Sequence, residues 1–310
     1  MVHSHHTHSG QYVAHAIDLL DDMVALAHLK GFTTFCLTEH MPRLTYLYPE
    51  EIDRDYTIDS LFATFEEYLV HATRLKEQYK GKMQVLVGFE VEGTNRDHLA
   101  LANKIRQNPM VDMCVGLVHF VEEIPIDFDR ELWEEASRKC GGVRQLYLRY
   151  FETQHAMLMA VKPEVVGHFD LIRLYTKEGE APTDLKQWPE VWQQIQTNID
   201  LINLQGGLIE LNSSAIRKGW LTPYPQSDVA EEVKRRGGRF CLSDDCHSLK
   251  QLGLNYGPVI DYANKIGIEY LYELGPNRQA LPVSLTDIKN LHNSNIHLED
   301  AYMRFGSHLN

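Results

Sequence analysis

The chain has 310 residues, of which 44% are hydrophobic and 24% are charged, and its formal net charge at pH 7 is −13. This composition excludes global disorder, and so acidic a surface disfavours general binding to nucleic-acid phosphates. The length suits one α/β barrel, so we expect a single domain over residues 1–310, with 275–310 as a C-terminal extension packed on the barrel.

The cysteines and the N-terminus indicate a reducing, cytoplasmic compartment. The chain has five cysteines, an odd number, and none of them forms a C-x-x-C pair,. The polar, histidine-rich start is unlike a signal peptide, and no apolar run approaches the ~20 residues that span a bilayer. We therefore expect no membrane partner, and the sequence leaves the oligomeric state open.

Short β-branched runs alternate along the chain with longer amphipathic stretches. The predicted strands are Thr33–Glu39, Met83–Glu92, Val111–Val121, Pro163–Ile172, Leu208–Ser214 and Arg239–His247, with Ile266–Leu274 as a weaker candidate. The predicted helices are 12–30, 57–80, 97–107, 143–161, 190–205, 227–237 and 248–265. This alternation predicts a distorted (β/α)7 TIM-like barrel with a parallel sheet. The aperiodic stretch 122–142 is expected to be an excursion over the barrel mouth.

Nearly every predicted strand carries a metal-capable side chain at or near its carboxyl end. In chain order these are Glu39 and His40, Glu90 and Glu92, His119, His168 and Asp170, and Asp244, Asp245 and His247. The carboxyl ends of barrel strands meet at one rim, where active sites form. A single histidine is more often a core residue, and an Asp-rich turn can simply open a helix. Five runs with the same pattern instead predict one site for Zn, Mn or Fe, which suit mixed imidazole and carboxylate ligands.

The opening MVHSHHTHSG supplies the missing first strand. His3 and His5 would face one side of a strand there, and His6 and His8 the other. A ligand at the carboxyl end of a strand must be preceded by the residues of that strand. His3 has almost none before it, so we expect His6 and His8 to be the ligands and His3 and His5 to be strand or supporting residues. His15 follows the Ser9–Gly10 turn and is expected to swing back over the mouth.

The ordered motifs resemble a known superfamily. H-x-H-[ST] with a further His seven residues on, [ST]-E-H, G-x-E, V-H, G-H-F-D and S-D-D-C-H resemble the PHP (polymerase and histidinol phosphatase) superfamily of metal-dependent phosphoesterases, over His6 to His247. Within it, HSHHTHSG, GHFDLIR and ELNSSAIRKG are most similar to histidinol-phosphate phosphatases of the fungal and Gram-positive type.

The resemblance implies a seven-stranded barrel with three divalent metal ions, Zn, Mn or Fe. By position, one ion would take His6, His8, Glu90 and Asp245, a second Glu90, His119 and His168, and a third His15, His40 and His247. Glu90, Asp245 and His247 would also be the catalytic residues. The usual family form is closer to S-D-A-H, so the extra Asp244 leaves open which aspartate is the ligand.

The activity that this resemblance implies is hydrolysis of L-histidinol phosphate to L-histidinol and phosphate, in histidine biosynthesis, by attack of a metal-bridged hydroxide. Such a histidinol-phosphatase is a phosphoric monoester hydrolase with a small-molecule substrate. The alternatives are a phosphoesterase for another small phosphate ester or nucleotide, and a non-catalytic metal-binding regulatory module. The sequence does not identify the general acid for the leaving group.

Residues beyond the metal ligands are expected to bind substrate. Arg173 and Arg217 follow strand ends, and a guanidinium fits phosphate oxygens bidentately,. Glu210 and Asn212 share a strand face and are expected to orient a ligand or the substrate. The candidates for contacts with the amine and imidazole of the substrate are Glu92, Asp170, Glu122 and Glu123.

Overall fold

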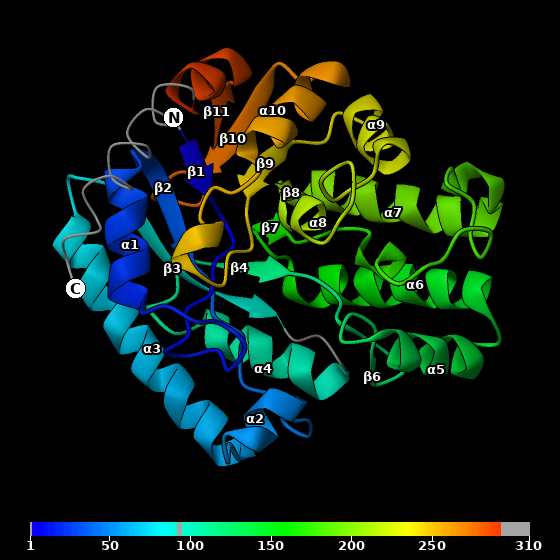
Figure 1. Cartoon of the computed structure of the whole chain (residues 1–310), viewed down its shortest axis with the longest axis horizontal. Coiled ribbons are helices and arrows are strands. Elements are labelled where there is room, and N and C mark those ends of the chain that lie inside the picture. The colour runs from blue at the N-terminus through cyan, green and yellow to red at the C-terminus, as the bar shows by residue number, and fades with distance from the viewer. Residues whose placement is uncertain (1, 92–94, 293–310) are drawn as a thin grey trace.

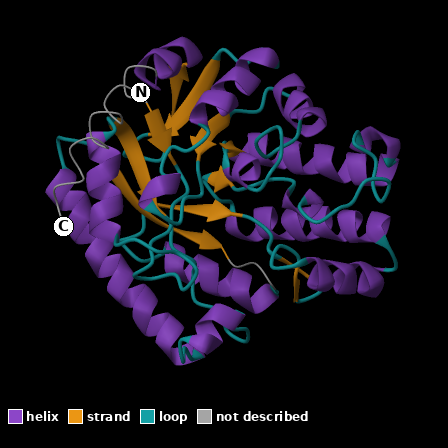
Figure 2. Cartoon of the chain, viewed as in Figure 1, coloured by secondary structure: helices purple, strands orange, loops and turns teal. Residues whose placement is uncertain are grey.

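A nearly closed barrel of parallel strands forms the centre of the molecule, and helices surround it (Figures 1 and 2). The computed structural model describes residues 2–91 and 95–292. The sheet has seven strands in the order β1-β2-β3-β4-β7-β8-β9. They are β1 (Val2–Ser4), β2 (Phe32–Leu37), β3 (Gln84–Val91), β4 (Met113–Gly116), β7 (Val165–Val166), β8 (Leu208–Asn212) and β9 (Phe240–Ser243). The distorted (β/α)7 TIM-like prediction is confirmed.

The first and last strands approach each other and nearly close the barrel. The backbone N–H of His5 donates to Leu242 O at 3.3 Å, and Thr7 forms an isolated parallel bridge with Cys246. The chain after β1 therefore lies beside the chain after β9. This contact brings the histidine-rich start to the same rim as Asp245 and His247.

Each of the seven predicted helical segments contains a helix, although the first begins at Leu20 and the last at Tyr256, later than expected, and polar caps fix several helix starts. The helices are α1 (Leu20–Leu29), α2 (Pro49–Asp53), α3 (Ile58–Tyr79), α4 (Arg96–Arg106), α5 (Arg130–Cys140), α6 (Val143–Val161), α7 (Pro189–Gln205), α8 (Ser214–Arg217), α9 (Ser227–Arg235) and α10 (Tyr256–Lys265). Thr57 caps α3 by accepting from Ser60 N, and Asn95 caps α4 by accepting from His98 N,. Within the described residues, no helix is both long enough and apolar enough to span a bilayer.

Apolar side chains fill the barrel interior at the end opposite the histidine-rich rim. Its apolar cluster includes Cys36, Leu86, Val115, Leu208 and Cys241 from the strands. Leu274 of β10 (Tyr270–Leu274) belongs to the same cluster, and its carbonyl accepts from the side chain of Gln84, the first residue of β3. The amino-terminal end of the barrel is therefore plugged by side chains, so the carboxyl end is left to hold a site.

The segment after Ile266 differs from the expectation of a further barrel strand. β10 pairs antiparallel with β11 (Ala280–Ser284) as a separate hairpin. In the described part of the predicted extension, 275–292, Val283, Leu285 and Ile288 are buried and belong to the main apolar core cluster. Its remainder, 293–310, lies outside the described residues.

The stretch 122–142 is more regular than its composition indicated. A two-strand hairpin, β5 (Phe120–Val121) with β6 (Ile124–Pro125), leads into α5. This helix was missed because its buried face is short: Trp133, Ala136 and Ser137 are its only buried residues among charged neighbours. The indole N–H of Trp133 donates to Ile172 O at 2.9 Å, which fastens the excursion to the segment after β7.

Candidate metal centre

The side chains predicted as metal ligands converge at the carboxyl rim of the barrel. His6, His8 and His15 follow β1, His40 follows β2, Glu90 lies in β3, His119 follows β4, His168 follows β7, and Asp245 and His247 follow β9. All of them except the fully buried His6 line one pocket of about 410 Å³.

Glu90 lies at the centre of this cluster, and imidazoles approach both of its oxygens. Oε1 lies 3.0 Å from His6 Nε2 and 3.6 Å from the Nε2 atoms of His119 and His168. Oε2 lies 2.6 Å from His40 Nδ1 and 3.4 Å from His8 Nε2. One carboxylate therefore faces two groups of imidazoles, which is the arrangement that a carboxylate shared between ions requires.

Asp245, and not Asp244, faces the cluster. Asp245 Oδ1 lies 3.7 Å from His6 Nε2 and 3.6 Å from His8 Nε2. The carboxylate of Asp244 accepts instead from Ser4 Oγ at 2.7 Å and from Gly253 N at 2.6 Å. Asp245 adopts a left-handed φ of 48°, a conformation that costs free energy in a non-glycine residue and that clusters at functional sites,.

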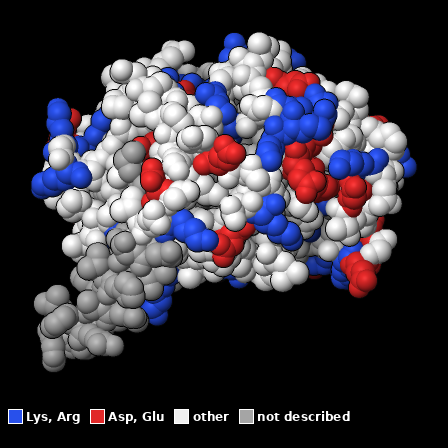
Figure 3. Space-filling model, turned by 90° about the horizontal axis from the view of Figure 1, so that it is seen from above, with Lys and Arg blue, Asp and Glu red and all other residues white. Residues whose placement is uncertain are grey.

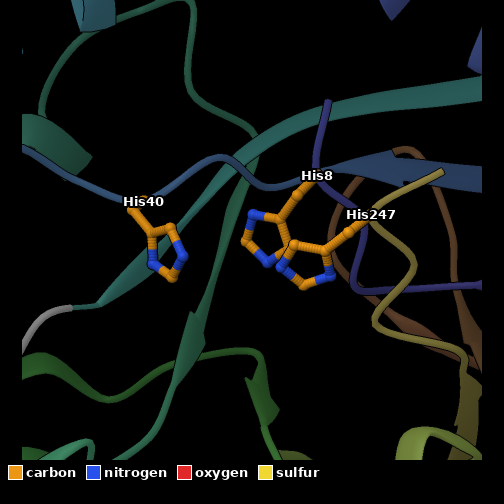
Figure 4. Close-up of side chains that lie close together, drawn as sticks. All are labelled: His8, His40 and His247. Atoms are coloured by element: carbon orange, nitrogen blue, oxygen red, sulfur yellow. The ribbon is translucent and has the colours of Figure 1, made fainter. Parts of the chain in front are cut away.

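A group of histidines lies at the outer part of the cluster. The rings of His8, His40 and His247 come from three separate segments and point toward one another (Figure 4). Their ligand nitrogens lie within 4.8 Å of one another, and His15 Nε2 lies 3.1 Å from His247 Nε2. The predicted group of His15, His40 and His247 is therefore close together, and His8 lies between this group and Glu90.

A tight loop returns His15 to the mouth. Gly10 N donates to Asp18 O at 2.8 Å, and Ile17 N donates to His247 O at 2.9 Å. A Cβ at Gly10 would lie 2.4 Å from the backbone of Ile17, so only glycine fits this close approach,. The expectation that His15 swings back over the mouth is confirmed by this geometry.

Burial keeps several of these imidazoles neutral and therefore able to donate a lone pair. Burial and the neighbouring His40 lower the pKa of His8 to about 3. Burial and neighbouring histidines also place the pKa values of His15 and His247 well below the usual range. Burial alone would raise the pKa of Glu90, but His40 and His6 hold it well below its usual range, so the carboxylate is ionised.

The unsatisfied atoms of the cluster fit a divalent cation. His6 Nε2, His8 Nε2 and Glu90 Oε2 are buried and lie at ion-pair distances from their neighbours, but none of them makes a hydrogen bond of normal geometry to a described residue. Burial opposes protonation of His6, yet Glu210, Asp245 and Glu90 raise its pKa well above the usual range, so positive charge is favoured at this point. Buried polar atoms of this kind are costly unless something binds them, and imidazole with carboxylate suits Zn, Mn or Fe.

Two further buried carboxylates, those of Glu210 and Glu39, hold His6 and His8 in place. Glu210 Oε1 lies 3.0 Å from His6 Nδ1, while Oε2 accepts from His168 N and Asn212 Nδ2, both at 2.9 Å. Glu39 Oε2 lies 3.5 Å from His8 Nδ1, and its Oε1 accepts from Ser9 Oγ at 2.6 Å. Carboxylates behind a histidine ligand fix its tautomer and ring orientation. Glu210 and Asn212 were expected to orient a ligand; this role of Glu39 was not anticipated, although it directly precedes His40.

His3 and His5 serve the barrel itself. His3 Nε2 accepts from Leu242 N at 3.0 Å, and His5 Nε2 accepts from Leu274 N at 3.1 Å. These contacts tie β1 to β9 and the residue directly after β1 to β10, in agreement with the expected strand or supporting role.

The two predicted phosphate-binding arginines lie in different surroundings. Arg217 lines the pocket and donates to the carbonyls of Asp244 and Asp245 at 3.3 and 3.0 Å. Arg173 is buried, donates to both oxygens of Asp228 at 2.8 Å and lies 2.9 Å from Asp170. The structure does not bring Arg173 to the pocket, because the 3₁₀ turn Leu171–Arg173 points its side chain at the first turn of α9. Lys218 lines the pocket and was missed.

The acidic residues expected at the mouth also lie elsewhere. Asp170 contacts Arg173, Glu122 pairs with Arg149 at 3.0 Å, Glu123 accepts from Asn95, and Glu92 lies outside the described residues. The pocket is lined instead by Glu50 and Asp127, together with Tyr48, Phe128 and Gln251. These residues lie on or at the start of α2, in the 3₁₀ turn Leu249–Gln251 and in a loop, where no strand-end pattern marks them.

Known proteins resemble this chain in sequence. Residues 4–214 match the PHP domain. A Schizosaccharomyces pombe protein named "probable histidinol-phosphatase" is 40% identical over 293 residues, covering 93% of this chain and 95% of that protein. The Saccharomyces cerevisiae histidinol-phosphatase is 34% identical over 323 residues, covering 94% and 96%.

Solved structures share the fold. One from Listeria monocytogenes is 21% identical, covers 82% of this chain and 98% of its own, and has a TM-score of 0.71. The histidinol phosphate phosphatase of Lactococcus lactis, solved in complex with zinc, L-histidinol and phosphate, is 18% identical, covers 90% and 98%, and has a TM-score of 0.63. These likenesses support the barrel assignment.

Proposed function

The chain belongs to the PHP-domain family, and from that premise we propose that it is a histidinol-phosphatase that hydrolyses L-histidinol phosphate to L-histidinol and phosphate. The observation that carries the proposal is the convergence of imidazoles from separate segments on the single carboxylate of Glu90. The two yeast relatives span nearly the whole chain, so the proposal extends to the full barrel and to a role in histidine biosynthesis.

The cluster would hold three divalent ions. His6, His8, Glu90 and Asp245 would bind one, Glu90, His119 and His168 a second, and His15, His40 and His247 a third. The position of Glu90 between two groups of imidazoles and the 3.1 Å approach of His15 Nε2 to His247 Nε2 support this assignment. Zinc in the Lactococcus relative makes it one candidate beside Mn and Fe.

Such ions would supply a water of lowered pKa and stabilise charge on the phosphoryl and leaving oxygens. The residues of the chain position the reactants around them. Arg217 has five N–H donors, and its contacts to two carbonyls leave others for phosphate oxygens,. Lys218 adds a second positive charge at the pocket wall. Both would neutralise the substrate phosphate during hydrolysis.

Two alternative functions are less well supported. A nuclease needs a basic groove, but the net charge is −13, and acidic and basic side chains are interleaved on the face shown in Figure 3,. A non-catalytic metal-binding module would have no need for Arg217 and Lys218 beside an open pocket. A phosphoesterase for another small phosphate ester remains the closest rival.

The test is phosphate release by the metal-loaded protein from L-histidinol phosphate, p-nitrophenyl phosphate and short single-stranded DNA. We expect a wide preference in kcat/KM for the first substrate. Equal rates on the first two substrates, or cleavage of the DNA, would contradict the assignment. Glu90→Gln serves as the control for contaminating phosphatases, because it should remove activity while the far-UV circular dichroism stays unchanged.

A further inference from the structure

The pocket is lined by charges of opposite sign at positions that lie across the barrel from each other. Arg217 contacts the carbonyls that follow β9, whereas Asp127 lies beside His119, which follows β4. In the strand order, β7 and β8 separate β4 from β9 on one side, and β1, β2 and β3 separate them on the other. A substrate at the rim would therefore meet a cationic wall at one end and an anionic wall at the other.

The main chain holds Asp127 at this place. Just before it, Ile126 N donates to His119 O at 2.8 Å. Just after it, the Tyr175 hydroxyl donates to Phe128 O at 2.7 Å, and Asp129 caps α5 by accepting from Leu132 N at 2.8 Å. The carboxylate of Asp127 is thus carried by a fixed turn, and such rigidity lowers the entropy cost of binding a partner.

The carboxylate of Asp127 can accept further hydrogen bonds. Asp127 Oδ2 lies 3.7 Å from His119 Nε2, while Oδ1 is shielded from solvent and accepts no hydrogen bond from any residue that the structure describes. A shielded anionic oxygen without a donor is costly. Asp127 lines the pocket and its side chain as a whole is 22% exposed, so a cationic N–H donor on the substrate can reach this carboxylate and form a charge-assisted hydrogen bond,.

The chemistry of the proposed substrate provides this donor at the right place. In L-histidinol phosphate the ammonium is on the carbon next to the ester-bearing methylene, so it stays close to the phosphate. A phosphate bound at Arg217 would then direct the ammonium toward the wall of the pocket that carries His119 and Asp127. Glu50, the other carboxylate lining the pocket outside the cluster, lies on α2, which follows β2 and not β4.

We propose that Asp127 binds the ammonium of the substrate and makes the site selective for phosphate esters with an amine on the neighbouring carbon. This inference rests on the proposed function, which it deepens by naming a specificity residue. Asp127 would act on selectivity while Glu90 and the histidines act on the phosphate.

The test compares Asp127→Asn with the wild-type holoenzyme on L-histidinol phosphate and on p-nitrophenyl phosphate, which has no amine. Loss of one charge-assisted hydrogen bond should lower kcat/KM for L-histidinol phosphate by roughly 10–100-fold. Activity on p-nitrophenyl phosphate and the metal content should stay within about twofold, and inhibition by L-histidinol should weaken in parallel. Glu123→Gln is the matched control, because it removes an exposed acid four residues away that does not line the pocket.

A second substrate pair separates this inference from the proposed function. Phosphoethanolamine and ethyl phosphate differ only in the ammonium, so their kcat/KM ratio should fall in Asp127→Asn and recover partly in Asp127→Glu. Equal losses on all substrates together with lost metal would make Asp127 a metal ligand and overturn the inference. An unchanged ratio would overturn it too. Failure of the wild-type protein to prefer L-histidinol phosphate would instead refute the proposed function.

Discussion

Glu210 and His6 form a fully buried pair in which Glu210 Oε1 lies 3.0 Å from His6 Nδ1. The carboxylate can only accept, so Nδ1 carries the proton and Nε2 is directed at Glu90 and Asp245,. The orientation of His6, the first proposed ligand in the chain, is thus set by a strand more than two hundred residues later, and the pair would couple the barrel architecture to ion binding.

Replacing Glu210 by Gln should weaken ion binding without removing a ligand. Partners behind a histidine ligand typically contribute ~10–100-fold to metal affinity. We expect a loss of that size, measured by competition with a chromophoric chelator. Glu273→Gln is the control, because Glu273 is also buried but accepts from Thr33 outside the rim. Equal losses in the two variants would indicate a general effect on stability and not on ion binding.

Arg217→Ala should chiefly weaken substrate binding. A hydrogen bond to a charged group is typically worth ~1.5–3 kcal/mol, so kcat/KM for L-histidinol phosphate should fall by roughly 10–100-fold, mostly through KM. Arg217→Lys should recover only part of this loss, because an ammonium lacks the bidentate fork. Steady-state kinetics with matched metal content measures both variants. Unchanged kcat and KM in Arg217→Ala would remove the residue from the site.

Arg173→Ala should destabilise the fold. The buried guanidinium joins Asp170 to Asp228, and removal of one partner from a buried ion pair costs ~3–5 kcal/mol,. Arg74→Ala offers a surface comparison, because Arg74 pairs with Asp21 at half-exposed positions and should cost only ~0–1 kcal/mol,. Urea unfolding of the two variants gives the difference, and similar midpoints would contradict the structural role of Arg173.

Glu232 should make stability depend on acid pH. Hydrogen bonds from Arg235, Arg236 and Gln196 lower the pKa of Glu232 from 4.5 to about 2. Since the folded pKa is depressed, this stabilisation is fully present above pH 4.5 and is lost as pH falls toward 2. Glu232→Gln should therefore be less stable than the wild type at neutral pH, with a difference that shrinks in acid. Urea titrations at several pH values measure this, and a difference between the two proteins that stays constant from neutral pH to pH 2 would contradict the role of Glu232.

Most of the residues at the carboxyl rim could be predicted from the sequence, because ionisable side chains follow the ends of the apolar strand segments. Glu90, His119 and His168 follow directly from apolar runs that end in ionisable residues, because parallel strands bring their carboxyl ends together. The first strand was predictable only through the histidines that it carries, since β1 is three residues long.

Long-range side-chain contacts were less accessible. Arg173 follows a strand end like Arg217, but nothing local reveals that Asp228, 55 residues later, takes its guanidinium. Glu50 lies on the short helix α2 and Asp127 in a turn, and the positions of such segments depend on tertiary contacts, such as the buried pair of Arg43 with Glu51 beside Tyr48. The choice between Asp244 and Asp245 likewise depended on Ser4 and Gly253, which only the folded chain brings near.

Anomalous diffraction from crystals of the metal-loaded protein tests the central claim most directly. The account predicts a compact group of ion peaks at the carboxyl rim, with the carboxylate of Glu90 shared between two of them and with Asp245, not Asp244, as a ligand. Ions bound away from Glu90, or a rim without ions in a protein that hydrolyses L-histidinol phosphate, would contradict it.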